Sequence, residues 1–298
     1  MRVYISADME GITGLVDAED VQPPGRDYER GRVMMTEDVN AAIRGAFAAG
    51  ASTLLVNDAH GPMRNLLPDL LDPRAVLIKG RPKPMGMIEG LTAEYDVVLC
   101  IGFHARAGAL GVLSHSFMGH EIEDIWLDDR LVGEIGLLHA TAAAYGVPVA
   151  LLTGDDIACA EMTAWDPAVA TVPVKHAKDR FAAQLAPVAE ARAAIESTTR
   201  QALANLPHQP ATDDPLSMAV TELLHEAQGT SPDPSAEPHH LAVRWQSASV
   251  ASHLPAIPGV HKRDDRTVEV TGTMPDLYRL FNLFLRVATA ITSNPPYC

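Results

Sequence analysis

The sequence is poor in cysteine, in basic residues and in long apolar runs, and each shortage excludes a class of protein. Three cysteines occur in 298 residues, and they are widely spaced and form no CxxC pair: Cys100, Cys159 and Cys298. Their spacing indicates neither a disulfide framework nor a thiolate zinc site. Three free thiols are compatible with the reducing cytosol.

Basic residues are outnumbered, with 23 Lys and Arg against 38 Asp and Glu and a net charge of -15. This charge opposes general binding to nucleic acid or to an anionic membrane, so we expect neither as a partner. No apolar run reaches the length of a membrane span, and no apolar signal segment precedes the acidic residues near the start. We therefore expect a cytoplasmic protein. The glycine-rich stretch 108–111 lacks phosphate-loop spacing, so nucleotide binding has no support.

Short apolar runs alternate with helical patterns along most of the chain. The runs that have the composition of buried strands are residues 3–7, 52–56, 75–79, 95–101 and 149–153. Because helical periodicity separates several of these runs, we expect a parallel sheet covered on both faces. The predicted fold class is α/β, a three-layer α/β/α arrangement with a largely parallel central sheet plus a smaller C-terminal α+β lobe.

Composition divides the chain into three predicted parts. Residues 1–206 are predicted to form an α/β core that carries all the candidate site residues described below, and an Ala-rich stretch at 177–206 predicts an amphipathic helix interrupted at Pro187. Residues 207–240 are rich in proline and form a surface excursion with a short helix. Residues 241–298 form a C-terminal α+β lobe packed on the core. Within the core, residues 125–132 predict a hairpin.

Polar side chains follow three of the predicted strands. Asp8 and Glu10 come directly after the first strand and, since extended backbone alternates its side chains, they point the same way. His60 follows the second strand, and His104 follows the strand at 95–101. In parallel α/β sheets ligands bind at the carboxyl ends of strands, so these residues are expected at one edge of one sheet. Glu134, at the start of a helix, adds a third carboxylate.

Two neighbouring carboxylates repel unless a proton or a cation lies between them. Taken singly, the acidic pair could be solvated or could cap a helix, and each histidine could be a hydrogen-bonded structural group. Together, the carboxylates and imidazoles suit zinc or another borderline divalent ion and exceed the ligands that one tetrahedral ion needs. This excess suggests two metals with Asp8 as the shared ligand, and the chemistry implied is hydrolysis.

His115, flanked by two serines in a glycine-rich segment, leaves several roles open. It could be a general acid or base, a nucleophile, an extra metal ligand, or a surface histidine of a loop. Asp155 and Asp156 follow the strand at 149–153 and could orient ligand histidines or cap the next helix. We favour a supporting role for both over direct metal binding.

At several of these motifs the chain resembles the zinc-dependent D-aminopeptidases of the dipeptide-transport operon type (DppA-like). The resemblance is near full length and is carried by SADMEGI from Ser6, YERGR from Tyr28, VNDAH from Val56, GFHARA from Gly102, SHS from Ser114 and VGEIGL from Val132. It implies a dinuclear zinc site, two Zn²⁺ per subunit, made by Asp8, Glu10, His60, His104 and Glu134, with His115 as the catalytic residue.

The resemblance also implies an activity and an assembly. The activity is hydrolysis of N-terminal D-amino acids, typically D-alanine, from short D-peptides or amides. The assembly is a homo-oligomeric ring, a decamer whose active sites face an inner channel. Two further hypotheses fit the residues: a metal-dependent hydrolase of another small amide or ester, and a non-catalytic peptide-binding protein of a transport system.

Overall fold

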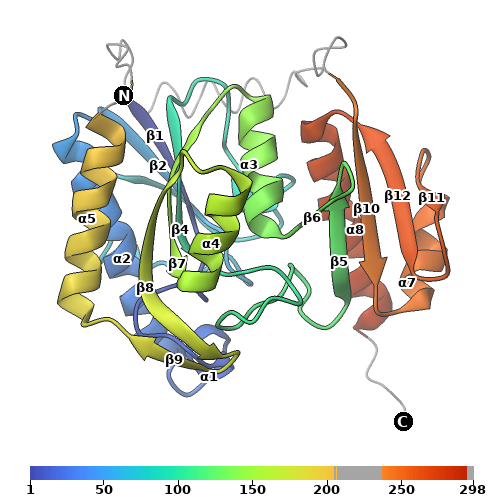
Figure 1. Cartoon of the computed structure of the whole chain (residues 1–298), viewed down its shortest axis with the longest axis horizontal. Helices are drawn as coiled ribbons and strands as arrows, with labels where there is room; N and C mark the ends of the chain where they lie inside the picture. The colour runs from blue at the N-terminus through green and yellow to red at the C-terminus, as the bar shows by residue number, and fades with distance from the viewer. Residues whose placement is uncertain (205, 207–236, 294–298) are drawn as a thin grey trace.

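The computed structural model describes residues 1–204, 206 and 237–293, and they form two β-sheets with helices between and around them (Figure 1). The central sheet has seven strands in the order β3-β2-β1-β4-β7-β8-β9. The second sheet has five strands in the order β11-β12-β10-β5-β6. Among the described helices, none is long and apolar enough to cross a membrane.

The central sheet is parallel except at one edge, where β9 pairs antiparallel with β8. Its strands are β1 (Arg2–Ala7), β2 (Thr53–Asp58), β3 (Val76–Ile78), β4 (Val97–Phe103), β7 (Val149–Asp155), β8 (Ala170–Asp179) and β9 (Ala182–Leu185). The five predicted apolar runs all fall on these strands. Every residue of β2 and β4 is buried, as expected for strands covered on both faces.

Helices cover both faces of the central sheet. One face packs against α2 (Tyr28–Ala48) and α5 (Val188–Ala204), and the other against α3 (Glu134–Ala144), α4 (Asp156–Trp165) and η1 (Gly86–Ile88); α1 (Ala18–Val21) precedes α2. Alternation along β1 divides the core in two, since Val3 and Ile5 join the cluster under α2 and α5 while Tyr4 joins the cluster on the other face. The predicted three-layer α/β/α arrangement is confirmed.

The second sheet is antiparallel and packs against the layer that holds α3. Its elements are β5 (Ile122–Leu127), β6 (Arg130–Val132), β10 (His239–Trp245), α7 (Ala248–His253), η2 (Leu254–Ala256), β11 (His261–Lys262), β12 (Thr267–Gly272) and α8 (Met274–Thr292). The predicted hairpin is present as β5 and β6, and Asp128 and Asp129 at its turn have φ of 50° and 63°. Positive φ at both central residues matches the twist of a two-residue hairpin loop.

Two strands of this sheet come from residues 122–132, so it is not confined to the C-terminal part of the chain. The division into 1–206, 207–240 and 241–298 stays a prediction. Residues 239 and 240, assigned to the proline-rich excursion, begin β10. Most of that excursion, with its predicted short helix, lies outside the described residues.

The prediction of a helix over residues 177–206, interrupted at Pro187, is wrong in its first third. Lys175, His176 and Ala177 of β8 pair with Leu185, Gln184 and Ala183 of β9 across a hairpin. Alanine has the highest helix propensity of the residues, but propensity is small against tertiary context, and pairing along the sheet edge outweighs it. The helix α5 begins at Val188, directly after Pro187, so the proline marks the start of the helix and does not interrupt it.

Gly102, near the carboxyl end of β4, is so closely packed that we expect a side chain there to destabilise the protein. This residue has φ of +75°, and a Cβ there would collide with the carbonyl oxygen of Asp8. Gly50, after α2, has φ of +92° but nothing within 4 Å of a Cβ. Gly50→Ala should therefore lose only about 1 kcal/mol for the left-handed backbone, whereas Gly102→Ala should lose several-fold more. Urea unfolding measures both, and equal losses would contradict the steric argument.

Candidate metal centre

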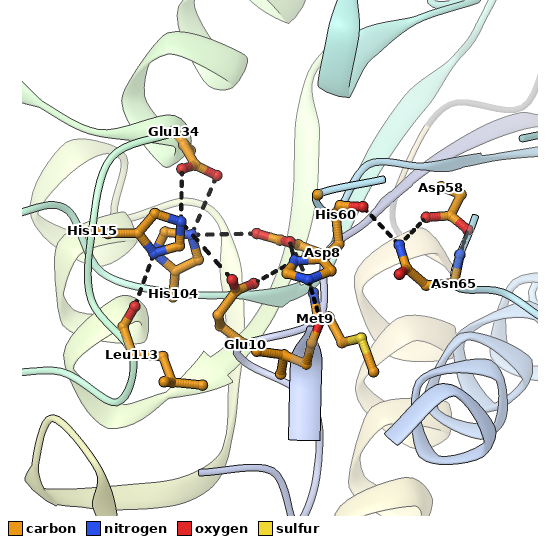
Figure 2. Close-up of polar contacts among 12 residues, drawn as sticks. Asp8, Met9, Glu10, Asp58, His60, Asn65, His104, Leu113, His115 and Glu134 are labelled. Atoms are coloured by element: carbon orange, nitrogen blue, oxygen red, sulfur yellow. Dashed lines mark hydrogen bonds and ion pairs between the residues drawn. The ribbon is translucent and has the colours of Figure 1, made fainter. Parts of the chain in front are cut away.

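Three neighbouring strands of the central sheet deliver the predicted site residues to one edge. β2, β1 and β4 lie side by side, and His60, Asp8 and His104 follow them within two residues. Glu10 lies in the loop after β1, and Glu134 is the first residue of α3. Figure 2 shows Asp8 and Glu10 between His60 on one side and His104 with His115 on the other. The structure thus brings all six predicted residues together.

Asp8 lies at the centre of this cluster and faces both strand-end histidines. Its Oδ1 is 3.1 Å from Nδ1 of His60, and its Oδ2 is 3.4 Å from Nε2 of His104. The same nitrogen of His60 is 2.9 Å from Glu10 Oε2, and the same nitrogen of His104 is 3.3 Å from Glu134 Oε2. One carboxylate therefore joins two similar groups, each completed by another carboxylate and an imidazole.

His115 reaches the same centre from the loop after β4. Its Nε2 lies 3.9 Å from Glu10 Oε1 and 4.0 Å from Glu134 Oε1, and its ring stacks on His104 with centroids 4.1 Å apart. Its Nδ1 lies 2.9 Å from the carbonyl oxygen of Leu113. The side chain is 19% exposed, against 6% or less for the other five residues. His115 is thus the member of the cluster that solvent reaches best.

Backbone carbonyls fix which nitrogen of each buried histidine carries a proton. His60 Nε2 lies 2.7 Å from the carbonyl oxygen of Val21, and His104 Nδ1 lies 3.0 Å from that of Ala105. A carbonyl can only accept, so each of these nitrogens donates. In the neutral rings the other nitrogen carries a lone pair, and it faces carboxylate oxygens. This arrangement needs a proton or a cation between nitrogen and oxygen.

Unsatisfied polar atoms gather at the same place. Among the described residues, Asp8 Oδ2, Glu10 Oε2 and His104 Nε2 are buried without a hydrogen-bond partner. Three groups have ligand atoms close enough together to hold an ion: Asp8, Glu10 and His60; Asp8, His104 and Glu134; Glu10, His104 and His115. Carboxylate oxygen and imidazole nitrogen are ligands that zinc accepts, so these residues fit a divalent metal.

The pKa of Asp8 is shifted in the opposite direction from the pKa values of the other two carboxylates. Burial raises the pKa of Asp8 to about 7, and the nearby Glu10 carboxylate adds to the rise. Burial also acts to raise the pKa of Glu10, but the imidazoles of His60 and His104 outweigh it and leave that pKa well below its usual value. Burial is likewise outweighed at Glu134, where His104 lowers the pKa. Opposite shifts of this kind are typical of carboxylates crowded into one site, and strongly shifted pKa values are common at functional sites.

The histidines are perturbed in two directions. Burial acts to lower the pKa of His60 and His104, but the Glu10 carboxylate beside the first and Glu134 beside the second raise both pKa values well above the usual range. For His115, burial and the positive charge of His104 lower the pKa. A neutral His115 with a free Nε2 can accept a proton near neutral pH.

Residues that the sequence analysis did not assign hold these ligands in place. The Asn65 side chain donates to the carbonyl of His60 at 2.7 Å and to Asp58 Oδ1 at 2.8 Å, and it accepts from the Tyr28 hydroxyl at 2.7 Å. Asp58 is the last residue of β2 and stands among the polar residues at this strand end, so the sequence could have indicated it. The role of Asn65 is recognisable only in the folded chain. The backbone amide of Phe117 donates to Glu134 Oε1 at 2.6 Å.

Asp155 supports the loop of His115 without contacting a ligand histidine. Its Oδ1 accepts from the amide of Ala158 and so caps α4, while its Oδ2 accepts from the amide of Val112 at 2.6 Å. Asp156 accepts from the amide of Ala177 at 2.8 Å. Both aspartates therefore support the structure around the site, and Asp155 also acts as a helix cap.

Comparison with known proteins identifies similar sequences and a similar structure. Residues 1–283 match the sequence model of the Peptidase M55 family, described as D-aminopeptidase. The chain is 42% identical over 205 residues to a D-aminopeptidase of Bacillus subtilis (strain 168), covering 69% of this chain and 74% of the relative. Its fold matches the solved Zn-dependent D-aminopeptidase DppA from Bacillus subtilis, described as a self-compartmentalizing protease, with a TM-score of 0.84, 32% identity and 100% coverage of both chains.

The raised histidine pKa values predict the pH dependence of metal binding. The raised pKa values keep His60 and His104 protonated near neutral pH in the metal-free protein, and a histidine must be neutral to bind a metal. Binding should therefore release protons, and affinity should rise with pH and fall in acid. Calorimetric zinc titrations in buffers of different ionisation enthalpy count these protons. His139→Gln, which alters a histidine paired with Asp166, should leave the count unchanged. A pH-independent affinity would contradict the assignment.

Proposed function

The chain belongs to the D-aminopeptidase family, Peptidase M55, and we propose that it is a zinc-dependent enzyme that removes N-terminal D-amino acids from short peptides or amides. The observation that carries this proposal is Asp8 shared between two ligand groups, with His115 beside both. The fold match to a Zn-dependent D-aminopeptidase over the whole chain supports zinc as the metal.

We assign one zinc ion to Asp8, Glu10 and His60 and a second to Asp8, His104 and Glu134. Two bound zinc ions would polarise the scissile carbonyl and lower the pKa of a water molecule. The chain's residues orient this chemistry, since the carbonyls of Val21 and Ala105 direct the ligand nitrogens of His60 and His104 inward. The third group, Glu10 with His104 and His115, shares a residue with each of the two assigned groups. We therefore assign no further ion to it and assign His115 to proton transfer.

His115 is the proposed acid and base. Its Nδ1–H donates to Leu113, so the lone pair at Nε2 points toward the space between Glu10 and Glu134. From there it would take a proton from the attacking water and return it to the leaving amine. The lowered pKa and the partial exposure of His115 suit a group that meets substrate and stays neutral near pH 7.

The proposed substrates are short peptides with an N-terminal D-residue, typically D-alanine, and the proposed assembly is a homo-oligomeric ring of the decameric type. The family description supports the first, and the description of the structural match as self-compartmentalizing supports the second. Active sites enclosed in such a ring would admit only small peptides. We propose a cytoplasmic location, which the free, buried thiols of Cys100 and Cys159 support.

Metal content and chirality test this function together. Purified protein loaded with zinc should hold about two equivalents per chain, measured by elemental analysis, and should cleave D-alanyl-D-alanine faster than its L,L isomer. A chelator should abolish cleavage and added zinc should restore it. Equal rates on both isomers would reject the D-specificity, and tight peptide binding without product would favour a non-catalytic binding protein.

Two substitutions separate metal binding from proton transfer. Asp8→Ala removes the shared ligand, so both zinc ions and turnover should be lost. His115→Ala should keep the metal and lower kcat by about 10²- to 10⁴-fold, the usual contribution of a general acid or base. His176→Ala changes an exposed histidine paired with Asp156 and serves as the control. Loss of metal in His115→Ala would reassign this histidine as a ligand.

A further inference from the structure

Lys175 is a fully buried lysine whose charge is met by backbone carbonyls. Its side chain, on β8, is 0% exposed. Its Nζ donates to the carbonyl oxygens of Glu10 at 2.6 Å, Ile12 at 3.0 Å and Leu15 at 2.6 Å. It makes no ion pair with any residue in the described part of the chain. The three N–H groups of an ammonium are therefore fully used by three carbonyls of one loop.

The loop that Lys175 holds is the one that carries Glu10. In the sheet, β4 and β7 separate β1 from β8, so this loop passes the carboxyl ends of two strands to reach the lysine. Other elements hold its amides: Gly11 donates to the carbonyl of Gly102 at 2.8 Å, and Thr13 donates to Asp38 at 2.9 Å. Buried carbonyls without partners are costly, and Lys175 donates to three of them in this loop, of which the carbonyl of Ile12 also accepts from the amide of Leu15 at 3.3 Å.

Different residues thus contact the backbone carbonyl and the side-chain carboxylate of Glu10. Lys175 holds the carbonyl, while Oε2 of the side chain lies 2.9 Å from His60 and Oε1 lies 3.9 Å from His115. We propose that Lys175 is a positioning residue that fixes the backbone of Glu10 and thereby sets the metal-binding geometry of its carboxylate. The inference rests on the proposed function, because it concerns a ligand of the proposed zinc site.

Electrostatics alone predicts the opposite effect. Lys175 is a positive charge close to a site for cations, so removing the charge without moving Glu10 would tighten metal binding. If the lysine positions the carboxylate, removing it weakens binding, because groups that orient metal ligands typically contribute about 10- to 100-fold to affinity. The sign of the change therefore separates the two roles.

The experiment compares full-length Lys175→Met with the wild type, using Zn²⁺ in competition with a chromophoric chelator and Co²⁺ as a spectroscopic probe. We expect zinc affinity to fall by about tenfold or more and the visible Co²⁺ spectrum to change, since it reports ligand geometry. Lys175→Arg, which keeps the charge and the donors, should recover part of the affinity. Lys175→Gln, whose amide can still donate to two carbonyls, gives the same test should the methionine variant not fold.

Leu203→Ala is the matched control for lost stability. Leu203 is fully buried in the last turn of α5. This end of α5 lies near the start of β1, so it is at the other end of the strands from the site (Figure 1). Leu203→Ala should lower stability and leave zinc affinity and the Co²⁺ spectrum as in the wild type. Unchanged or tighter binding by folded Lys175→Met would overturn the positioning role, as would equal losses in Leu203→Ala. A wild type that binds no metal would instead overturn the proposed function, and this inference with it.

Discussion

The repulsion among three buried carboxylates is the constraint on which this structure depends. Asp8, Glu10 and Glu134 are each about 5% exposed or less and lie within one cluster, and like charges this close are tolerated only around protons or cations. Backbone carbonyls direct one proton of His60 and of His104 away from the centre, so the remaining lone pairs face carboxylate oxygens. The cluster is therefore complementary to positive charge at two places, and Asp8 belongs to both.

The surrounding fold holds the loops that carry these ligands, and buried ammonium groups have a large part in it. Lys175 binds the loop after β1, and Lys83 binds the end of β2 through Asn57 Oδ1 at 2.6 Å and the carbonyl of Asp58 at 2.7 Å. Glycine completes the packing, because a Cβ at Gly102 would occupy the space of Asp8's carbonyl. Because these residues hold the backbone of the loops that carry the ligands, they limit how far the ligands can move apart when no cation lies between them.

Much of the fold could be read from local pattern. The apolar runs became strands of the central sheet, Glu134 begins helix α3 as expected, and the Asp128–Asp129 turn closes the expected hairpin. The failure came at residues 177–187, where an alanine-rich composition indicated helix. There β9 pairs with β8 at the edge of the sheet. The helix preference of single residues does not encode such a pairing, because it depends on tertiary structure.

The sequence by itself determined which residues stand at strand ends, because the alternation of apolar runs with polar clusters is local, and this was enough to propose Asp8, Glu10, His60, His104 and Glu134 as one site. Only the tertiary structure decided that β2, β1 and β4 are neighbours, that His115 stacks on His104, and that Lys175 reaches the loop of Glu10 from 165 residues away. These relations depend on strand order and on the path of a loop across other strands, which local periodicity does not encode.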